Sequence, residues 1–264
     1  MADFVHLHNH SEYSLLDGLS KVKEMVARAK ELNMKAIATT DHGNMYGAIK
    51  FYKECLAQGI KPIIGAEIYV AKKTRHDKTI EDKDYNHLIL LAKDFTGYKN
   101  LMKIISISHL EGFYYKPRTD IKLLEEFSGG IICLTACVNG YVSEPLLSND
   151  KTEAIRRLEK LQEIYKDNLF LEIQRHINVP PQKPLNEMLI DLSKKYAIPL
   201  VATNDNHYIN KEDAEAQEIL LCIGTQTTTL LLRKQFLQTL KNFLTKKNYF
   251  LRKSFWAFFL QTTH

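Results

Sequence analysis

Histidine and aspartate side chains recur in short motifs that lie at the ends of apolar stretches. His6 and His8 are two residues apart in FVHLH, Asp205 and His207 are two apart in NDNH, and His42 stands in TTDHG. Side chains two residues apart in an extended chain point to the same face. Imidazole nitrogens and carboxylate oxygens are ligands for zinc and manganese. The motifs therefore favour a site for several divalent metal ions.

Three further residues with metal-binding side chains belong to neighbouring apolar stretches. Glu67 lies in KPIIGAEIYV, His87 opens HLILLA, and Cys137 directly follows GIICLTA. A thiolate ligand favours a softer ion such as zinc over magnesium. A lone histidine is more often a surface or core residue, so the prediction depends on the motifs taken together. Histidines outside this pattern are predicted to have no metal role: His10, His76, His109, His176 and His264.

The elements that must position these side chains alternate between strand-like and helix-like patterns. Apolar stretches predict seven strands, at residues 4–8, 35–40, 61–70, 87–92, 130–136, 168–174 and 198–204. Amphipathic patterns predict helices at 20–32, with Ser20 as its cap, and at 152–165 and 184–196. This alternation is typical of right-handed βαβ units around a parallel sheet or barrel, in which the carboxyl ends of the strands converge at one mouth. The charged segment 72–86 is predicted to be an exposed loop.

Composition narrows the class of protein. The chain of 264 residues has four cysteines without a CxxC pair, so we expect free or metal-bound thiols in a reducing compartment. It has no apolar run long enough to span a bilayer and no secretory leader pattern at its start, which predicts a cytoplasmic protein with no membrane partner.

The charge is concentrated in the last forty residues. The net charge of +5 comes from 36 basic and 31 acidic residues, and residues 225–264 contribute seven basic residues and no acidic one. We therefore expect a main domain at 1–223 and a separate basic tail at 224–264, which contains the only tryptophan, Trp256. Such a tail is typical of a shifted reading frame or a truncated gene. The alternative is a basic, aromatic helix for DNA or a membrane surface.

Six segments of the chain carry a family resemblance, from about residue 4 to residue 223. They are HLHNHSEYSLLDG, TTDHGNMYGAIKFYK, GIKPIIGAEIYVA, HLILLAKDFTGYKNLMKI, EGFYYKPRTD and VATNDNHYINKEDAEAQEILLCI. In this order they resemble consecutive blocks of the PHP (polymerase and histidinol phosphatase) domain of bacterial DNA polymerase III alpha subunits. The resemblance implies an α/β fold, a distorted seven-stranded β/α (TIM-like) barrel, with up to three divalent ions, zinc or manganese.

The resemblance also implies a ligand set and a reaction. Nine residues of this sequence match the metal site of the family: His6, His8, Asp17, His42, Glu67, His87, Cys137, Asp205 and His207. Among them, Asp205, His207 and His42 are the expected catalytic residues for hydrolysis of a phosphate ester. The expected substrate is the 3′ end of DNA, cleaved in a 3′–5′ proofreading exonuclease reaction, with pyrophosphate second. Lys116, Arg118 and Arg175 are candidates to hold the phosphate.

Three functions from different classes stay open. In the first, the chain is the N-terminal PHP part of a replicative DNA-directed DNA polymerase, whose partners are DNA and other replisome subunits and whose polymerase domain we expect this sequence to lack. In the second it is a stand-alone PHP phosphatase or pyrophosphatase. In the third it is a non-catalytic replisome interaction module. The complete nine-residue set favours catalysis over the interaction module.

Overall fold

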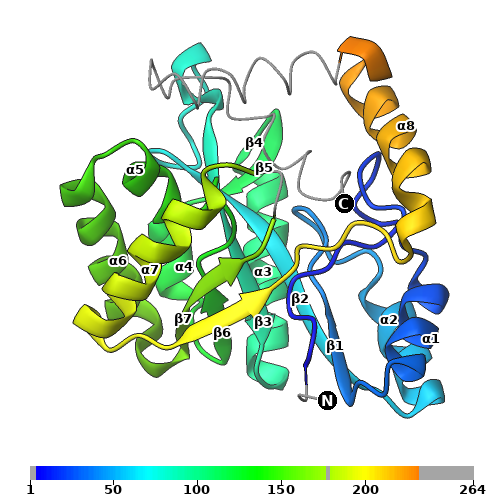
Figure 1. Cartoon of the computed structure of the whole chain (residues 1–264). Helices are drawn as coiled ribbons and strands as arrows, with labels where there is room; N and C mark the ends of the chain where they lie inside the picture. The colour runs from blue at the N-terminus through cyan, green and yellow to red at the C-terminus, as the bar shows by residue number, and fades with distance from the viewer. Residues whose placement is uncertain (1–3, 177–178, 232–264) are drawn as a thin grey trace.

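A computed structural model of the chain describes residues 4–176 and 179–231 (Figure 1). Its strands are β1 Ala36–Thr39, β2 Lys61–Ala71, β3 Tyr85–Ala92, β4 Phe113–Tyr114, β5 Lys116–Thr119, β6 Ile131–Leu134, β7 Leu169–Gln174 and β8 Leu200–Thr203. Its α-helices are α1 Val22–Glu31, α2 Ala48–Gln58, α3 Phe95–Leu110, α4 Ile121–Glu126, α5 Ser143–Leu147, α6 Lys151–Tyr165, α7 Gln182–Tyr196 and α8 Ala214–Thr225. Short 3₁₀ turns are η1 Ile80–Lys83, η2 Lys166–Asn168 and η3 Lys211–Asp213.

The strands form one curled, mixed sheet with helices packed around it. The strand order is β4-β5-β2-β3-β6-β7-β8, and β1 pairs with the first residues of β2. In Figure 1, α5, α6 and α7 lie on one side of the molecule and α1, α2 and α8 on the other. The predicted α/β class with a barrel-like sheet is confirmed, and six of the seven predicted strands are present as β1, β2, β3, β6, β7 and β8.

Strand β3 shows why strands of this sheet have continuous apolar sequences. Leu88 and Leu90 face the large outer core beneath the helices, whereas Ile89 and Leu91 face an inner cluster with Leu134. Because both faces of β3 are buried along Leu88–Leu91, this part of the strand is apolar at every position and shows no polar alternation.

The sequence FVHLH, predicted as the first strand, is instead an extended segment that hydrogen-bonds on both sides. On one side Ala38 N donates to His6 O (2.9 Å) and Thr40 N donates to Asn9 O (2.8 Å). On the other side His10 N donates to Asn206 O (2.7 Å). Residues 6–10 therefore lie between β1 and the chain that follows β8, and bring three histidines to the edge where those strands end.

The prediction of an all-parallel sheet is wrong. The sheet is not all parallel, because β3 runs antiparallel to both β2 and β6. The reason is the connection from β2 to β3: residues 72–84 contain only the 3₁₀ turn η1 and no crossover helix, which a parallel neighbour would need. In addition, the β4/β5 hairpin, which lies within the motif EGFYYKPRTD, was not predicted.

Ser20 does not cap the first helix. Helix α1 begins one residue later than predicted, and its N-cap residue, Lys21, makes no side-chain capping bond. The backbone explains the difference, because Ser20 O accepts a hydrogen bond from Glu12 N (2.8 Å) and the two segments bridge at Ser11 and Ser20. Ser20 is thus buried in a chain crossing. The other two predicted helices match α6 and α7 to within two residues at each end.

The predicted boundary at residue 223 falls in the last turn of α8, which ends at Thr225. The remainder of the predicted tail, residues 232–264, lies outside the described residues. Cys55, Cys133, Cys137 and Cys222 are buried, and none of them forms a disulfide within the described residues. Within the described residues, no helix has both the length and the apolar character needed to cross a membrane.

Candidate metal centre

The metal-binding side chains meet at one edge of the curled sheet. His42 follows β1 and bridges to Glu67 of β2, and Asp205 and His207 follow β8. His87 stands near the start of β3 rather than its end. Because β3 is antiparallel to β2, its first residues lie at the same edge as the carboxyl ends of the parallel strands. One antiparallel strand therefore adds a ligand to the mouth without changing where the mouth is.

Glu67 is the centre of the cluster. Its Oε1 lies 2.7 Å from His87 Nδ1 and 3.2 Å from His42 Nδ1. Its Oε2 lies 2.9 Å from His8 Nε2 and 3.4 Å from His10 Nε2. The residue is only 1% exposed. A single buried carboxylate is thus shared by four imidazoles.

Asp205 contacts two of the same histidines, His8 and His10. Its Oδ1 lies 3.1 Å from Nε2 of both His8 and His10, and 3.6 Å from His207 Nδ1. Asp205 has a positive φ of 52°, a left-handed conformation that is uncommon outside glycine and often marks a functional position. That backbone turn directs the carboxylate of Asp205 into the cluster.

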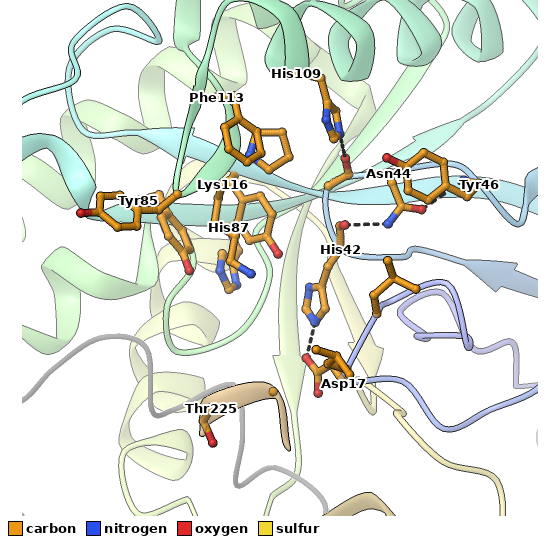
Figure 2. Close-up of a pocket in the computed structure, with 17 residues that line it drawn as sticks. Asp17, His42, Asn44, Tyr46, Tyr85, His87, His109, Phe113, Lys116 and Thr225 are labelled. Atoms are coloured by element: carbon orange, nitrogen blue, oxygen red, sulfur yellow. Dashed lines mark hydrogen bonds and ion pairs between the residues drawn. The ribbon is translucent and has the colours of Figure 1, made fainter. Parts of the chain in front are cut away.

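Asp17 closes the outer side. Its Oδ2 lies 2.8 Å from His42 Nε2 and 3.4 Å from His207 Nε2 (Figure 2 shows the first contact). Gln217 of α8 donates to the backbone carbonyl of Asp17 and so holds the loop in place. The ring of His10 stacks on two other imidazoles, with its centroid 4.0 Å from that of His42 and 4.1 Å from that of His207.

The donor atoms converge in the way that cation ligands do. Two groups of ligand atoms lie within 4.8 Å of one another: His8, His10, Glu67 and Asp205 in one, and His10, His42 and His207 in the other. Buried nitrogens on His42 and His87 approach Glu67 closely but make no hydrogen bond there. Atoms that gather closely without hydrogen-bonding geometry are aimed at a common point, so these residues fit divalent cations.

Neighbouring charges shift the pKa values of the side chains in the cluster. Burial alone would raise the pKa of Glu67, but the positive charges of His87 and His42 hold it well below its usual value. Burial alone would lower the pKa of His42, but Glu67 and Asp17 raise it to about 10. In the same way, Asp205 and Glu172 raise the pKa of His8 against its burial. The buried carboxylates therefore favour positive charge around them, which bound metal ions would supply.

Glu172 is a site residue that the sequence analysis missed. It is buried on β7 and accepts from His8 Nδ1 at 2.7 Å, from Gln174 Nε2 at 3.0 Å and from the hydroxyl of Thr203. A carboxylate behind a ligating histidine fixes the ring and its tautomer. The available signal was an acidic residue inside the apolar stretch NLFLEIQ, where only a paired charge is tolerated.

His10 is the second site residue that the sequence analysis missed. Like the ring of His8, its ring is fixed by a contact on the nitrogen that points away from the cluster. Its Nδ1 lies 3.0 Å from Ser14 Oγ, which in turn donates to Asp41 Oδ1 at 2.8 Å. Ser14 Oγ also accepts from the backbone N–H of His42 at 3.1 Å. The signal was present in HLHNH, because His10 continues the two-residue spacing of His6 and His8.

The structure does not bring His6 into the cluster. Its Nδ1 lies 2.9 Å from Asn206 Nδ2, and its ring packs edge-on against Phe4. The segment 6–10 is irregular rather than a straight strand, so two-residue spacing does not place all three histidines on one face.

Cys137 is 1% exposed within the large apolar core, and the described clusters of ligand atoms do not include it. Burial, and the nearby charges of Asp205 and Glu67, raise the pKa of its thiol well above the usual value.

The three candidates for holding phosphate have different surroundings. Arg118 is fully buried and donates to the backbone carbonyls of Gly112, Asp82 and Asp77, which makes it a structural residue. Arg175 is exposed and does not line the cavity described below. Lys116 is exposed, and its Nζ lies 5.4 Å from the centroid of the Tyr69 ring.

A cavity of about 460 Å³ opens directly onto the cluster (Figure 2). Asp17, His42 and His87 line it together with aromatic residues and Lys116. An open cavity beside the ligands gives a substrate access to ions held there, which a purely structural metal site does not need.

Comparison with known proteins identifies the class. The family model described as "PHP domain" matches residues 6–176, and the chain belongs to that family. A crystal structure from Bifidobacterium adolescentis, described as a metal-dependent phosphoesterase, has a similar fold: the TM-score is 0.54 at 12% identity, over 78% of this chain and 88% of that one.

The particular relatives agree with the predicted resemblance. The chain is 50% identical over 224 residues to the DNA polymerase III subunit alpha of Borreliella burgdorferi, covering 84% of this chain and 19% of the relative. It is 46% identical over 230 residues to the same subunit of Thermus aquaticus, covering 85% of this chain and 19% of the relative. The chain therefore spans about a fifth of the length of these curated relatives.

Proposed function

We propose that this domain hydrolyses phosphate esters with the help of divalent ions held by His8, His10, Asp17, His42, Glu67, His87, Asp205 and His207. The observation that carries the proposal is the buried carboxylate of Glu67, which four imidazoles share beside an open cavity. Bound ions would activate water and neutralise phosphate oxygens. The nitrogen-rich donor set suits zinc or manganese better than magnesium, and two overlapping groups of ligands have room for more than one ion.

The chain's own residues would divide the remaining work. Asp205 and Glu67 fix the inner imidazoles from two sides and so set the geometry before substrate arrives. His42 lines the cavity, and its Nε2 is 3.4 Å from that of His207. His42 and His207 are therefore placed to hold an ion beside the cavity, while the carboxylate of Asp205 lies 3.1 Å from Nε2 of both His8 and His10. We retain these three as the catalytic residues.

We further propose that the substrate is the 3′ end of a DNA strand, removed as 3′–5′ proofreading, and that the chain corresponds to the PHP part of a replicative polymerase subunit in the cytoplasm. The support is the similarity to DNA polymerase III alpha subunits over 84% of this chain. DNA polymerisation and contacts with other replisome subunits would then belong to the longer protein. Pyrophosphate or a small phosphate ester is the second candidate substrate, because the cavity is open enough for either.

The test uses single-stranded DNA with a label near its 3′ end, the purified chain, and Mn²⁺ or Zn²⁺. We expect stepwise trimming that EDTA abolishes. Asp205→Asn should reduce the rate by about 100-fold or more, because losing a catalytic metal typically removes several kcal/mol of transition-state stabilisation. The matched control is Asp191→Asn, an exposed aspartate on α7, which should trim at the unmutated rate.

Bound metal without trimming of DNA and without hydrolysis of pyrophosphate would contradict the proposal and favour the non-catalytic interaction module. Pyrophosphate hydrolysis alone would keep the phosphoesterase and exclude the exonuclease. Thermal unfolding of each variant separates loss of activity from loss of fold.

A further inference from the structure

The β4/β5 hairpin has an unusually tight tip. Tyr114 pairs with Lys116, so Tyr115 is the single residue between the two strands. Tyr115 has a φ of 60°, a conformation that is a true outlier for a bulky residue, and its side chain is 69% exposed. A strained, exposed aromatic residue at a tip that could have used glycine needs a reason, and such strain gathers at sites that clamp ligands.

The hairpin forms one wall of the cavity beside the ligand cluster. Phe113, Tyr115 and Lys116 all line the cavity, and Phe113 is 53% exposed. Figure 2 shows Phe113 and Lys116 on the same side of the opening as His87, with Asp17 and His42 across from them. The hairpin therefore presents two aromatic rings and one cation within the opening to the candidate metal centre.

A row of rings extends this wall. The centroid of His109 lies 6.4 Å from that of Phe113 and 6.5 Å from that of Tyr46. His109 Nε2 lies 2.9 Å from the carbonyl oxygen of Gly43, which fixes its ring beside Phe113 and Tyr46. Tyr46 is 62% exposed. Exposed rings around a cavity that also contains charged side chains favour a flat, aromatic ligand over a purely inorganic one.

The hairpin is anchored to the rest of the fold by residues other than Phe113 and Tyr115. Its inward contacts are made by Tyr114, whose ring lies 5.3 Å from the buried guanidinium carbon of Arg118. Arg118 then ties the hairpin to the backbone of Gly112 and of the segment before β3. The ring of Tyr115 packs edge-on against Tyr114, with centroids 4.7 Å apart, yet Phe113 and Tyr115 both keep more than half of their surface exposed beside the cavity.

We propose that Phe113 and Tyr115 stack against the terminal nucleobase of the substrate and that Lys116 binds a phosphate of the same nucleotide. This inference rests on the proposed phosphoesterase function and specifies how it selects a substrate. Bases splayed from a strand stack on aromatic side chains whatever their identity, and lysine supplies the charge for the backbone. The cavity, about 460 Å³, is within the usual size range for organic ligands.

The experiment measures stacking without requiring hydrolysis. The probe is a single-stranded oligonucleotide with 2-aminopurine at its 3′ end and a phosphorothioate as the last linkage, added to the purified chain with Mn²⁺. Stacking on a ring quenches 2-aminopurine fluorescence. We expect saturable quenching by the unmutated protein and about tenfold weaker binding by Tyr115→Asn, since base stacking on one ring contributes on that scale.

The variants are chosen so that folding does not decide the result. Asparagine tolerates a positive φ, so Tyr115→Asn removes the ring without adding strain at the tip. Tyr115→Phe keeps the ring and should quench as the unmutated protein does. Phe95→Ala is the matched control: Phe95 is 71% exposed at the opposite end of α3 and does not line the cavity. It should leave the binding of the probe unchanged.

A second probe carries an abasic residue at the 3′ end. The unmutated protein should bind it about as weakly as Tyr115→Asn binds the 2-aminopurine strand. Equal binding of both probes by the unmutated protein, or full quenching by Tyr115→Asn, would overturn the inference even if DNA is trimmed. Ring-dependent quenching with no hydrolysis of unmodified DNA or of pyrophosphate would instead keep the base-binding wall and refute the phosphoesterase proposal.

Discussion

The ligand cluster and the hairpin wall are neighbours at the same cavity, yet they are built in opposite ways. The cluster joins residues from six separate segments of the chain, and its central carboxylate, Glu67, is 1% exposed. The wall comes mainly from one local hairpin whose tip residue, Tyr115, is 69% exposed. The difference indicates that ion positions are fixed before binding, whereas contacts with the organic part of the substrate form on arrival.

Glu67→Gln should have the largest effect on metal content and hydrolysis, because Glu67 is the central carboxylate of the ligand cluster. A neutral amide no longer balances the imidazoles around it, so we expect metal content to fall and hydrolysis to drop by about 100-fold or more. Removing one partner of a buried charge pair typically costs about 3–5 kcal/mol, so the metal-free variant should also unfold at lower denaturant concentration.

Glu81→Gln is the control for that variant, since Glu81 is exposed on η1. Metal content by mass spectrometry and urea unfolding with EDTA give the two readouts. An unchanged metal content in Glu67→Gln would show that the cluster is an ion-pair network rather than a metal centre.

His10→Gln compared with His6→Gln sharpens the comparison at a finer scale. His10 lies within 3.4 Å of both Glu67 and Asp205, whereas His6 contacts Asn206 outside the cluster. We expect His10→Gln to lower metal affinity by about 10-fold to 100-fold, and His6→Gln to leave it within about twofold. Competition with a chromogenic chelator measures both constants. If His6→Gln weakened metal binding more than His10→Gln, the ligands in HLHNH would be His6 and His8 instead of His8 and His10.

Cys137→Ser should have the smallest effect on metal content. The thiol lies in the apolar core near the charges of Asp205 and Glu67, but outside the grouped ligand atoms. If it ligates, serine should reduce zinc content more than manganese content, because a thiolate prefers the softer ion. If both contents stay the same and only the melting temperature falls, Cys137 is a packing residue.

Local patterns in the sequence predicted most of the fold. Continuous apolar stretches such as HLILLA mark strands buried on both faces, and six of the seven predicted strands were found. Strand direction was not predictable in this way, since apolar content is the same in either direction. The missing crossover helix in residues 72–84 was the one available sign that β3 is antiparallel.

The spacing of the motifs predicted where the site lies better than it predicted which residues form it. Glu67 and Asp205 contact His8, and His42, His87 and His207 lie in the same cluster, because the ends of neighbouring strands converge where the sheet curls. Asp17, which only the family resemblance indicated, lies beside His42 and His207. The choice between His6 and His10 depended on how an irregular segment turns. Glu172 depended on which buried acid lies behind His8 in three dimensions. Neither is encoded in a two-residue spacing.

The central claim, that the buried cluster holds divalent ions, is tested most directly by anomalous diffraction from crystals of the purified chain soaked in Mn²⁺. The account predicts an anomalous peak at about 2.0–2.3 Å from donor atoms of His8, His10, Glu67 and Asp205, with a second beside His42 and His207. Peaks only at surface carboxylates, with the cluster side chains still paired to one another, would contradict it.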